Sequence, residues 1–170
     1  MNYKKAINTI AFLVVLMSAT ASYAISLEYK VKAGLIYNIL KFVELKNYKN
    51  GQINLCVVGS NPFGTFLNEF PSNVVKGKKI VINFNYSEFS DCTIAYISRS
   101  EEKKASSIIS EMSKYKILTI SDIDRFARLG GMIEFGEVSG NIVMDFNASE
   151  AKSQGVLISS KLLQIGRRVY

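Results

Sequence analysis

Apolar residues near the start of the chain recur at helical spacing. From Leu27 to Leu45 they follow a 3.6-residue stripe, which predicts an amphipathic helix that opens at Ser26. Three aromatic residues, Tyr29, Tyr37 and Phe42, widen the face that we expect to be buried. The aliphatic members of the stripe are Val31, Leu35, Ile36, Ile39, Leu40 and Val43.

Beyond this helix, short apolar runs that end at turn residues predict buried strands. We expect such strands at Ile53–Val58, Lys79–Phe84, Thr93–Ile97 and Ile117–Ile120. Two further runs, Met132–Phe135 and Ile142–Phe146, flank Ser139-Gly140-Asn141, which is typical of a hairpin turn.

Helical signals separate these strands. We expect a short helix from Asn61-Pro62 to Phe70, a helix capped near Ser100 that runs to Met112, and a short helix over Ile123–Ala127 capped by Ser121-Asp122. The tail from Ala148 to Val169 predicts two helical pieces broken near Gly155. Alternating strands and helices indicate an α/β three-layer sandwich, with a mostly parallel central sheet, a late antiparallel hairpin and helices on both faces.

The first 24 residues have the three zones of a secretory signal peptide. Lys4 and Lys5 precede a charge-free apolar run that is shorter than the about 20 residues needed to span a bilayer. Small residues end at Ala24, so we place cleavage there, with Ala21 as the second choice and a retained anchor as the alternative. No cysteine follows to carry a lipid. We therefore expect residues 1–24 to be removed and residues 25–170 to form one exported, soluble α/β domain.

The charge balance is basic but moderate. Loss of residues 1–24 would remove two of the 21 basic residues and none of the 14 acidic ones, which lowers the formal charge from +7 to +5. The basic residues are scattered and no nucleic-acid motif accompanies them, so a solvated surface explains them better than nucleic-acid binding.

The chain has two cysteines, Cys56 and Cys92. An even pair in an oxidising compartment predicts a disulfide, and the alternative is two separate buried thiols.

The usual chemistry of a catalytic or metal site is missing from the sequence. The chain contains no histidine, which removes the commonest general base and a common metal ligand. The acidic residues match no metal-binding spacing and are interpreted as solvated surface. These are Glu101, Glu102, Asp122, Asp124, Glu134 and Glu137. Ser159-Ser160 before Lys161 most simply caps the last helix. We expect no catalytic residues, no metal and no cofactor.

One turn lies where many α/β proteins bind phosphate. Gly59, Ser60, Asn61 and Gly64 follow a predicted strand and precede a predicted helix, but the GxGxxG and P-loop spacings are absent. A tight structural turn is the simpler interpretation, and a small anionic ligand is the alternative.

The order of local motifs resembles the YfiR family of periplasmic proteins across nearly all of residues 25–170. Each stretch is weak alone, and the order and spacing carry the resemblance. The stretches are Glu28–Ala33 with Tyr37–Glu44, Leu55–Gly59 with Asn61–Gly64, Cys92 with Ile94–Ser98 and Glu101, Leu118–Asp122, Phe126-Ala127 with Gly130–Ile133, Asn141–Asn147, and Gly155–Leu163.

The resemblance implies a periplasmic regulator that binds the sensor region of an inner-membrane diguanylate cyclase and lowers cyclic di-GMP synthesis and biofilm formation. An OmpA-like outer-membrane lipoprotein would sequester it, and the symmetry of a dimeric partner suggests a homodimer. The family's structural disulfide corresponds to Cys56 and Cys92. Some members carry a second cysteine pair in the stretch that Arg125–Phe135 occupies here, and its absence argues against a redox role for that stretch.

Candidate partner contacts lie in the first and last predicted helices, although both stripes are also suited to the core. They are Tyr29, Tyr37, Phe42, Leu162, Leu163 and Arg167.

Two other functions stay open from the sequence. One is a periplasmic small-molecule binder that uses the Gly59–Gly64 turn and feeds a sensor or transporter. The other is a structural envelope protein held by its basic charge.

Overall fold

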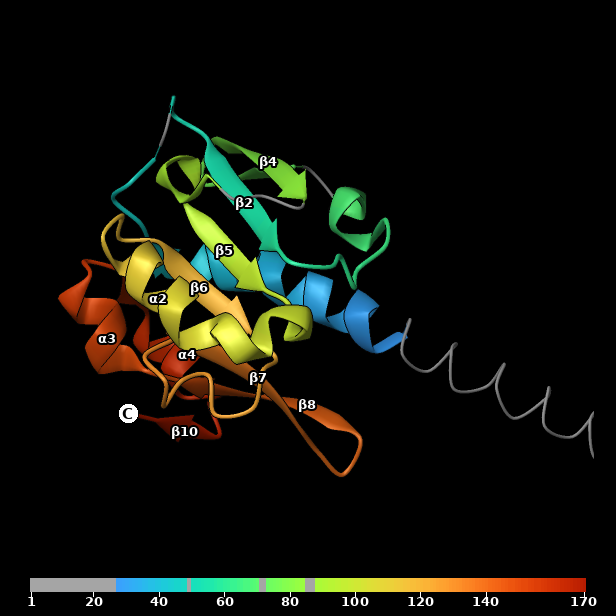
Figure 1. The fold of residues 1–170 in the computed structure, drawn as a ribbon. Helices are drawn as coiled ribbons and strands as arrows, with labels where there is room; N and C mark the ends of the chain where they lie inside the picture. The colour runs from blue at the N-terminus through green and yellow to red at the C-terminus, as the bar shows by residue number, and fades with distance from the viewer. Residues whose placement is uncertain (1–26, 49, 71–72, 85–87) are drawn as a thin grey trace, which may run out of the picture.

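A mostly parallel sheet forms the centre of the computed structural model (Figure 1). The structure describes residues 27–170 except 49, 71–72 and 85–87, so the predicted signal peptide and the predicted cap at Ser26 lie outside the described residues. In the described residues, eight strands take the order β10-β8-β7-β6-β5-β2-β4-β3. Their bounds are β2 Ile53–Val58, β3 Val74–Val75, β4 Lys78–Phe84, β5 Ile94–Ile97, β6 Leu118–Ser121, β7 Ile133–Val138, β8 Asn141–Phe146 and β10 Arg168–Val169.

Helices cover both faces of this sheet, as the alternation of predicted elements indicated. The N-terminal helix, residues 27–42, lies behind the sheet in Figure 1, and α2 lies in front of it. The remaining helical elements are η1 Phe66–Glu69, η2 Phe89–Asp91, η3 Arg99–Lys104, α2 Ala105–Ser113, α3 Ala148–Ser153 and α4 Ser160–Leu163. No helix in the described part of the chain combines the length and apolar character that crossing a membrane requires.

The strands divide the core because successive side chains point to opposite faces of a sheet. In β2, Leu55 and Val57 pack in the larger cluster with the N-terminal helix, whereas Cys56 and Val58 pack in the smaller cluster with α2. Both clusters consist of buried residues, so the central strands are apolar on both faces and appear in the sequence as continuous apolar runs.

The predicted hairpin is confirmed. Strands β7 and β8 pair antiparallel, with Val138 opposite Asn141. Ser139 and Gly140 form the turn with φ of 51° and 77°. Positive φ at both central positions matches the twist of the flanking strands.

Several helix predictions differ from the structure. The first helix ends at residue 42, because Val43–Glu44 forms a strand, β1, that pairs with β9, Leu157–Ile158, in a separate two-stranded sheet. The segment from Asn61 to Phe70 contains only the short 3₁₀ helix η1. The helix after β5 opens as the 3₁₀ helix η3 and is capped by Ser98, whose side chain accepts from the Ser100 N–H.

The predicted helix over Ile123–Ala127 is a series of turns instead. Arg125 has a φ of 60°, which a continuing helix does not accommodate. The Glu134 carboxylate accepts from the backbone N–H groups of Arg125 (3.2 Å) and Ala127 (3.1 Å). These contacts from a distant strand give two backbone N–H groups of the turn their acceptor.

Candidate functional site

Polar side chains gather at one edge of the sheet. Strands β2, β5, β6 and β7 are parallel neighbours, so their carboxyl ends lie at the same edge, the usual place for a site in an open α/β sheet. Asp122 follows β6, Arg99 lies just after β5, and Glu137 lies near the end of β7. The N-terminal helix brings Tyr29 and Lys32 to the same edge.

Asp122 is the centre of a buried hydrogen-bonded cluster. Its side chain has no exposed surface, and its Oδ2 accepts from Lys32 Nζ at 2.6 Å and from the Tyr29 hydroxyl at 2.8 Å. Its Oδ1 accepts from the Tyr96 hydroxyl at 2.7 Å. Lys32 is only 2% exposed, so a buried cation directly compensates a buried anion.

Two further charged residues extend this cluster toward solvent. Arg99 Nε donates to the Asp122 backbone oxygen at 3.0 Å and lies 3.4 Å from Asp122 Oδ2. Glu28 forms an ion pair with Lys32 one helical turn away. The cluster therefore connects the N-terminal helix to the ends of β5 and β6.

The environment keeps the charges of the cluster in place. Burial alone would raise the pKa of Asp122, but hydrogen bonds from Lys32, Tyr96 and Tyr29 outweigh it and lower that pKa below its ordinary value. Burial, together with the negative charge of Asp122, raises the pKa of both tyrosines. A carboxylate with a lowered pKa and donors on both oxygens is a poor general base and a good structural anchor.

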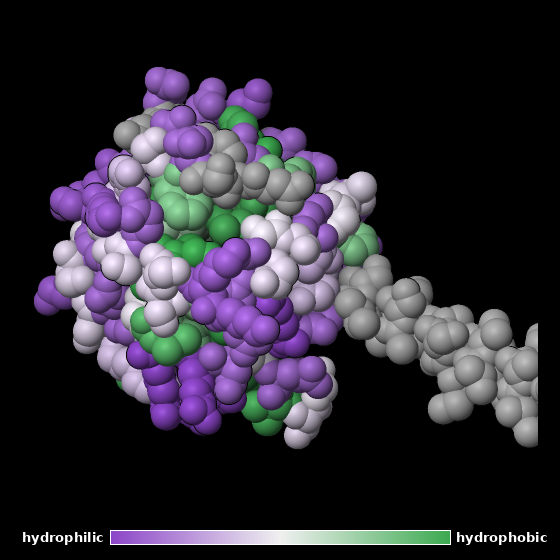
Figure 2. Space-filling model, in the orientation of Figure 1, coloured by the Kyte–Doolittle hydropathy of each residue, from purple (hydrophilic) through white to green (hydrophobic). Residues whose placement is uncertain are grey.

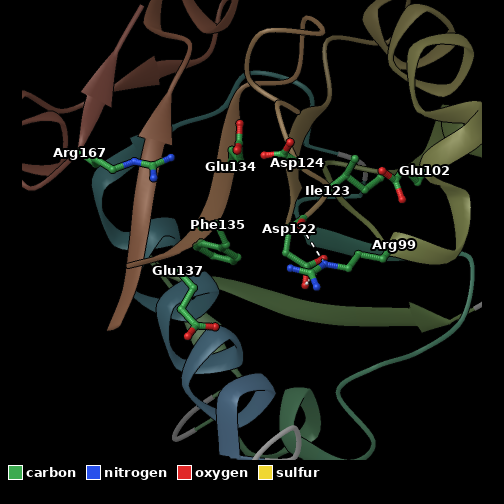
Figure 3. Close-up of a pocket in the computed structure, with 10 residues that line it drawn as sticks. Arg99, Glu102, Asp122, Ile123, Asp124, Glu134, Phe135, Glu137 and Arg167 are labelled. Carbon is green, nitrogen blue, oxygen red and sulfur yellow. Dashed lines mark hydrogen bonds and ion pairs between the residues drawn. The ribbon is translucent and has the colours of Figure 1, made fainter. Parts of the chain in front are cut away.

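A cavity of about 340 Å³ lies beside the cluster (Figure 3). Acidic side chains dominate its lining: Asp122, Asp124, Glu102, Glu134 and Glu137, against Arg99 and Arg167. Figure 3 shows the Glu134 and Asp124 side chains near one another and Glu137 apart from them, beside the N-terminal helix. Among the described residues no group of histidine, cysteine or acidic side chains is arranged to hold a metal ion.

The interpretation of the acidic residues as solvated surface is wrong for two of them. Asp122 is 2% exposed and Glu134 is 5% exposed. Asp122 is buried because Lys32 and the tyrosines neutralise and solvate it, and Glu134 because it accepts the N–H groups of the turn at residues 125–127. Asp124 is largely exposed and pairs with Arg125 at 3.6 Å.

The turn after β2 is filled by side chains of the protein. The Ser60 N–H donates to Ser100 Oγ at 2.9 Å, and Asn61 Oδ1 accepts from the Phe63 N–H at 2.9 Å. A Cβ at Gly59 would approach Ser100 Oγ to 2.4 Å, so there is little free space. Two donors that could bind an anion already have partners, and the ligand hypothesis for Gly59, Ser60, Asn61 and Gly64 stays a prediction.

The aromatic residues of the first helix occupy three different environments. Tyr29 belongs to the Asp122 cluster and packs edge-on against Phe63, with ring centroids 5.5 Å apart. Tyr37 packs on Phe70 at 5.1 Å. Phe42 is 41% exposed and is the most exposed of the three.

The three candidates at the end of the chain range from buried to exposed. Leu162 is buried and Leu163 packs against the larger core cluster. Arg167 forms a two-pronged ion pair with Asp145, with N–O distances of 2.8 and 2.5 Å. The structure therefore does not bring the six predicted partner contacts together on one surface, and their role in binding stays a prediction.

The predicted disulfide is confirmed. Cys56 in β2 and Cys92 before β5 are bonded, with a Cα–Cα distance of 5.8 Å, on the face covered by α2.

The sequence did not reveal the Lys32–Asp122 pair. A lysine inside an apolar helical stripe is a weak signal for a buried cation, and Asp122 was interpreted as a helix cap. The partners lie 90 positions apart, so no local spacing links them.

Comparison with known proteins adds a family and a fold. The family model described as YfiR/HmsC-like matches residues 29–167. No curated protein matches the chain. The crystal structure of a conserved domain protein from Vibrio cholerae O1 biovar eltor str. N16961 is similar in fold, with a TM-score of 0.55 at 13% identity. The similarity covers 84% of this chain and 60% of that one.

Proposed function

This chain belongs to the YfiR/HmsC-like family, and on that premise we propose that it is a periplasmic regulatory protein that restrains an inner-membrane diguanylate cyclase. It binds the periplasmic sensor region of the cyclase, lowers cyclic di-GMP and so limits biofilm formation. The observation that carries the proposal is the family match over residues 29–167, most of the chain that would remain after removal of a signal peptide.

The polar cluster agrees with a role in binding rather than turnover. Asp122 is the most deeply buried carboxylate at the edge where the parallel strands end. Lys32, Tyr29 and Tyr96 donate hydrogen bonds to its two oxygens. Such an arrangement fixes the N-terminal helix on the sheet and presents a rigid surface. Rigid surfaces bind with a smaller entropic penalty, because less conformational freedom is lost on docking.

Regulation then follows from differential affinity. A protein that binds the inactive conformation of a sensor region more tightly than the active one shifts the equilibrium toward the inactive conformation. An OmpA-like outer-membrane lipoprotein that competes for the regulator would release the cyclase. A homodimer of this chain would suit a two-fold symmetric cyclase.

Whole-cell cyclic di-GMP, measured by mass spectrometry in the native host, tests the proposal. Deletion of the gene should raise the nucleotide, and the full-length wild-type chain should restore the original level. A chain without residues 2–24 is the matched control, because it should stay in the cytoplasm and fail to restore the level. Unchanged cyclic di-GMP on deletion, in cells where a cyclase is demonstrably active, would contradict the proposal.

A further inference from the structure

The apolar stripe of the N-terminal helix is left uncovered at its start. Ile36 and Ile39 are buried in the core, but Leu27 is 54% exposed and Val31 is 46% exposed. Residues four positions apart lie on the same side of a helix, so Leu27 and Val31 form one exposed apolar strip.

This strip is one wall of a groove of about 480 Å³. The opposite wall is the end of the β7–β8 hairpin, where Ile142 and Glu137 line the groove. Val138, in the same part of the hairpin, is 45% exposed. Figure 1 shows the end of the β7–β8 hairpin at the lower right. At the corresponding place in Figure 2, a hydrophobic surface (green) lies among hydrophilic residues (purple).

The charge of the groove is opposite to that of the whole chain. Of the residues that the structure describes, Glu28 and Glu137 line it and no lysine or arginine does, although the chain carries a formal charge of +7. Glu28 pairs with Lys32, whereas Glu137 has no ion pair among the described residues. Glu137 also lines the acidic cavity that contains Asp124 and Glu134, so this carboxylate borders both the apolar groove and the acidic cavity.

We propose that this groove is a docking site for a protein segment in which an apolar side chain is next to lysine or arginine. The apolar side chain would contact Leu27, Val31 and Ile142, and the cation would lie near Glu137 and the acidic cavity. This inference rests on the proposed function, since it specifies the chemistry of the segment through which a partner docks.

The chain itself offers little to fill the groove from its N-terminal side. With cleavage after Ala24, two residues precede Leu27, and they reach about 7 Å when extended. The chemistry of the lining therefore favours a segment from another protein, and a second copy of this chain becomes an outcome of the test.

Binding of a designed probe to the purified chain of residues 25–170 tests the groove directly. The probe is a fluorescein-labelled peptide that alternates leucine and lysine over seven positions, followed by fluorescence anisotropy. One comparison peptide replaces the leucines by serine and the other replaces the lysines by glutamate. We expect the leucine–lysine peptide to bind at least about tenfold more tightly than either, since each comparison removes one of the two interactions.

Two variants locate the probe. Val31→Lys and Glu137→Lys should each weaken binding about tenfold, because each adds a positive charge and removes one contact. Leu129→Lys is the control for Val31→Lys, since both residues are 46% exposed, and Glu88→Lys is the control for Glu137→Lys. All four positions are exposed, so thermal unfolding should show that each variant stays folded.

Equal affinities for the three peptides, or equal losses in the variants and their controls, would overturn the proposal. So would a concentration-dependent dimer that Val31→Lys dissociates, because the groove would then hold a second copy.

Measurement of cellular cyclic di-GMP separates this inference from the proposed function. Full restoration by the chain with both Val31→Lys and Glu137→Lys would overturn the groove and leave the regulator standing. If the leucine–lysine peptide binds specifically but deletion of the gene leaves cyclic di-GMP unchanged, the groove stands and the proposed regulatory function is overturned.

Discussion

At the scale of single residues, Lys32 and Asp122 depend on one another. Each is buried, and a buried charge is costly unless an opposite charge and hydrogen bonds compensate it. The tyrosine hydroxyls of Tyr29 and Tyr96 complete the set of donors around Asp122.

Replacement of Lys32 by methionine should destabilise the protein by about 3–5 kcal/mol, because it removes the buried cation and leaves the Asp122 charge with only the largely exposed Arg99 beside it. Urea unfolding measures the change in the free energy of unfolding. Lys41→Met is the control, since Lys41 is exposed, donates to Asn38 and lies 4.4 Å from the centre of the Tyr37 ring, and its cost should stay within about 1 kcal/mol. A loss below about 1 kcal/mol for Lys32→Met would show that the pair contributes little.

The lowered pKa of Asp122 predicts an acid-sensitive fold. Because the pKa is lower in the folded state than in the unfolded state, the carboxylate contributes stability above its ordinary pKa. That contribution disappears as the pH falls through the folded pKa. The free energy of unfolding should therefore decline below about pH 4, and the decline should be shallower in Asp122→Asn. Identical pH profiles for the two proteins would assign acid sensitivity to other carboxylates.

At the scale of elements, the disulfide ties two adjacent parallel strands of the sheet. It joins Cys56 in β2 to Cys92, two positions before β5, and closes a loop with a sequence separation of 36. Parallel strands need long connections, so a covalent link between neighbours removes much of the freedom of the unfolded chain.

Loss of this link should cost about 2–5 kcal/mol. Cys56→Ala with Cys92→Ala and the reduced wild-type protein should show similar losses in urea unfolding, because both lack the same bond. Agreement between the two separates loss of the bond from side-chain effects. An unfolding midpoint that stays the same in the reduced protein would contradict this prediction.

The strands were easier to predict than the helices. The run Ile53–Val58 is apolar on both faces, and the observed β2 has the same bounds. The segment Ile123–Ala127 carries helix signals but forms turns, because Glu134 reaches its backbone from β7. The contact with a distant side chain outweighed the local helix propensity of this segment, and local propensity contains no information about such a contact.

At the scale of the whole molecule, the predicted signal peptide sets the expected N-terminus of the exported chain. We expect cleavage after Ala24, so intact-mass spectrometry of the periplasmic fraction should give a chain that begins at Ile25. Replacement of Ala24 by a bulky residue should block processing at this site. A mature chain that begins at Thr20, Ser22 or Met1 would contradict the predicted site.

The sequence alone determined the class of fold, the main strands, the hairpin at Ser139-Gly140 and the cysteine pair. The fold class, the strands and the hairpin follow from patterns within single segments, because a local pattern shows which side of an element is buried. The cysteine pair follows from the number of cysteines and the oxidising compartment that the predicted signal peptide implies. Only the tertiary structure decided that Lys32 lies against Asp122, that Leu27 and Val31 stay uncovered, and that Ser100 fills the turn after β2. Each of these depends on how distant elements pack, and the spacing of residues along one element does not specify its neighbours.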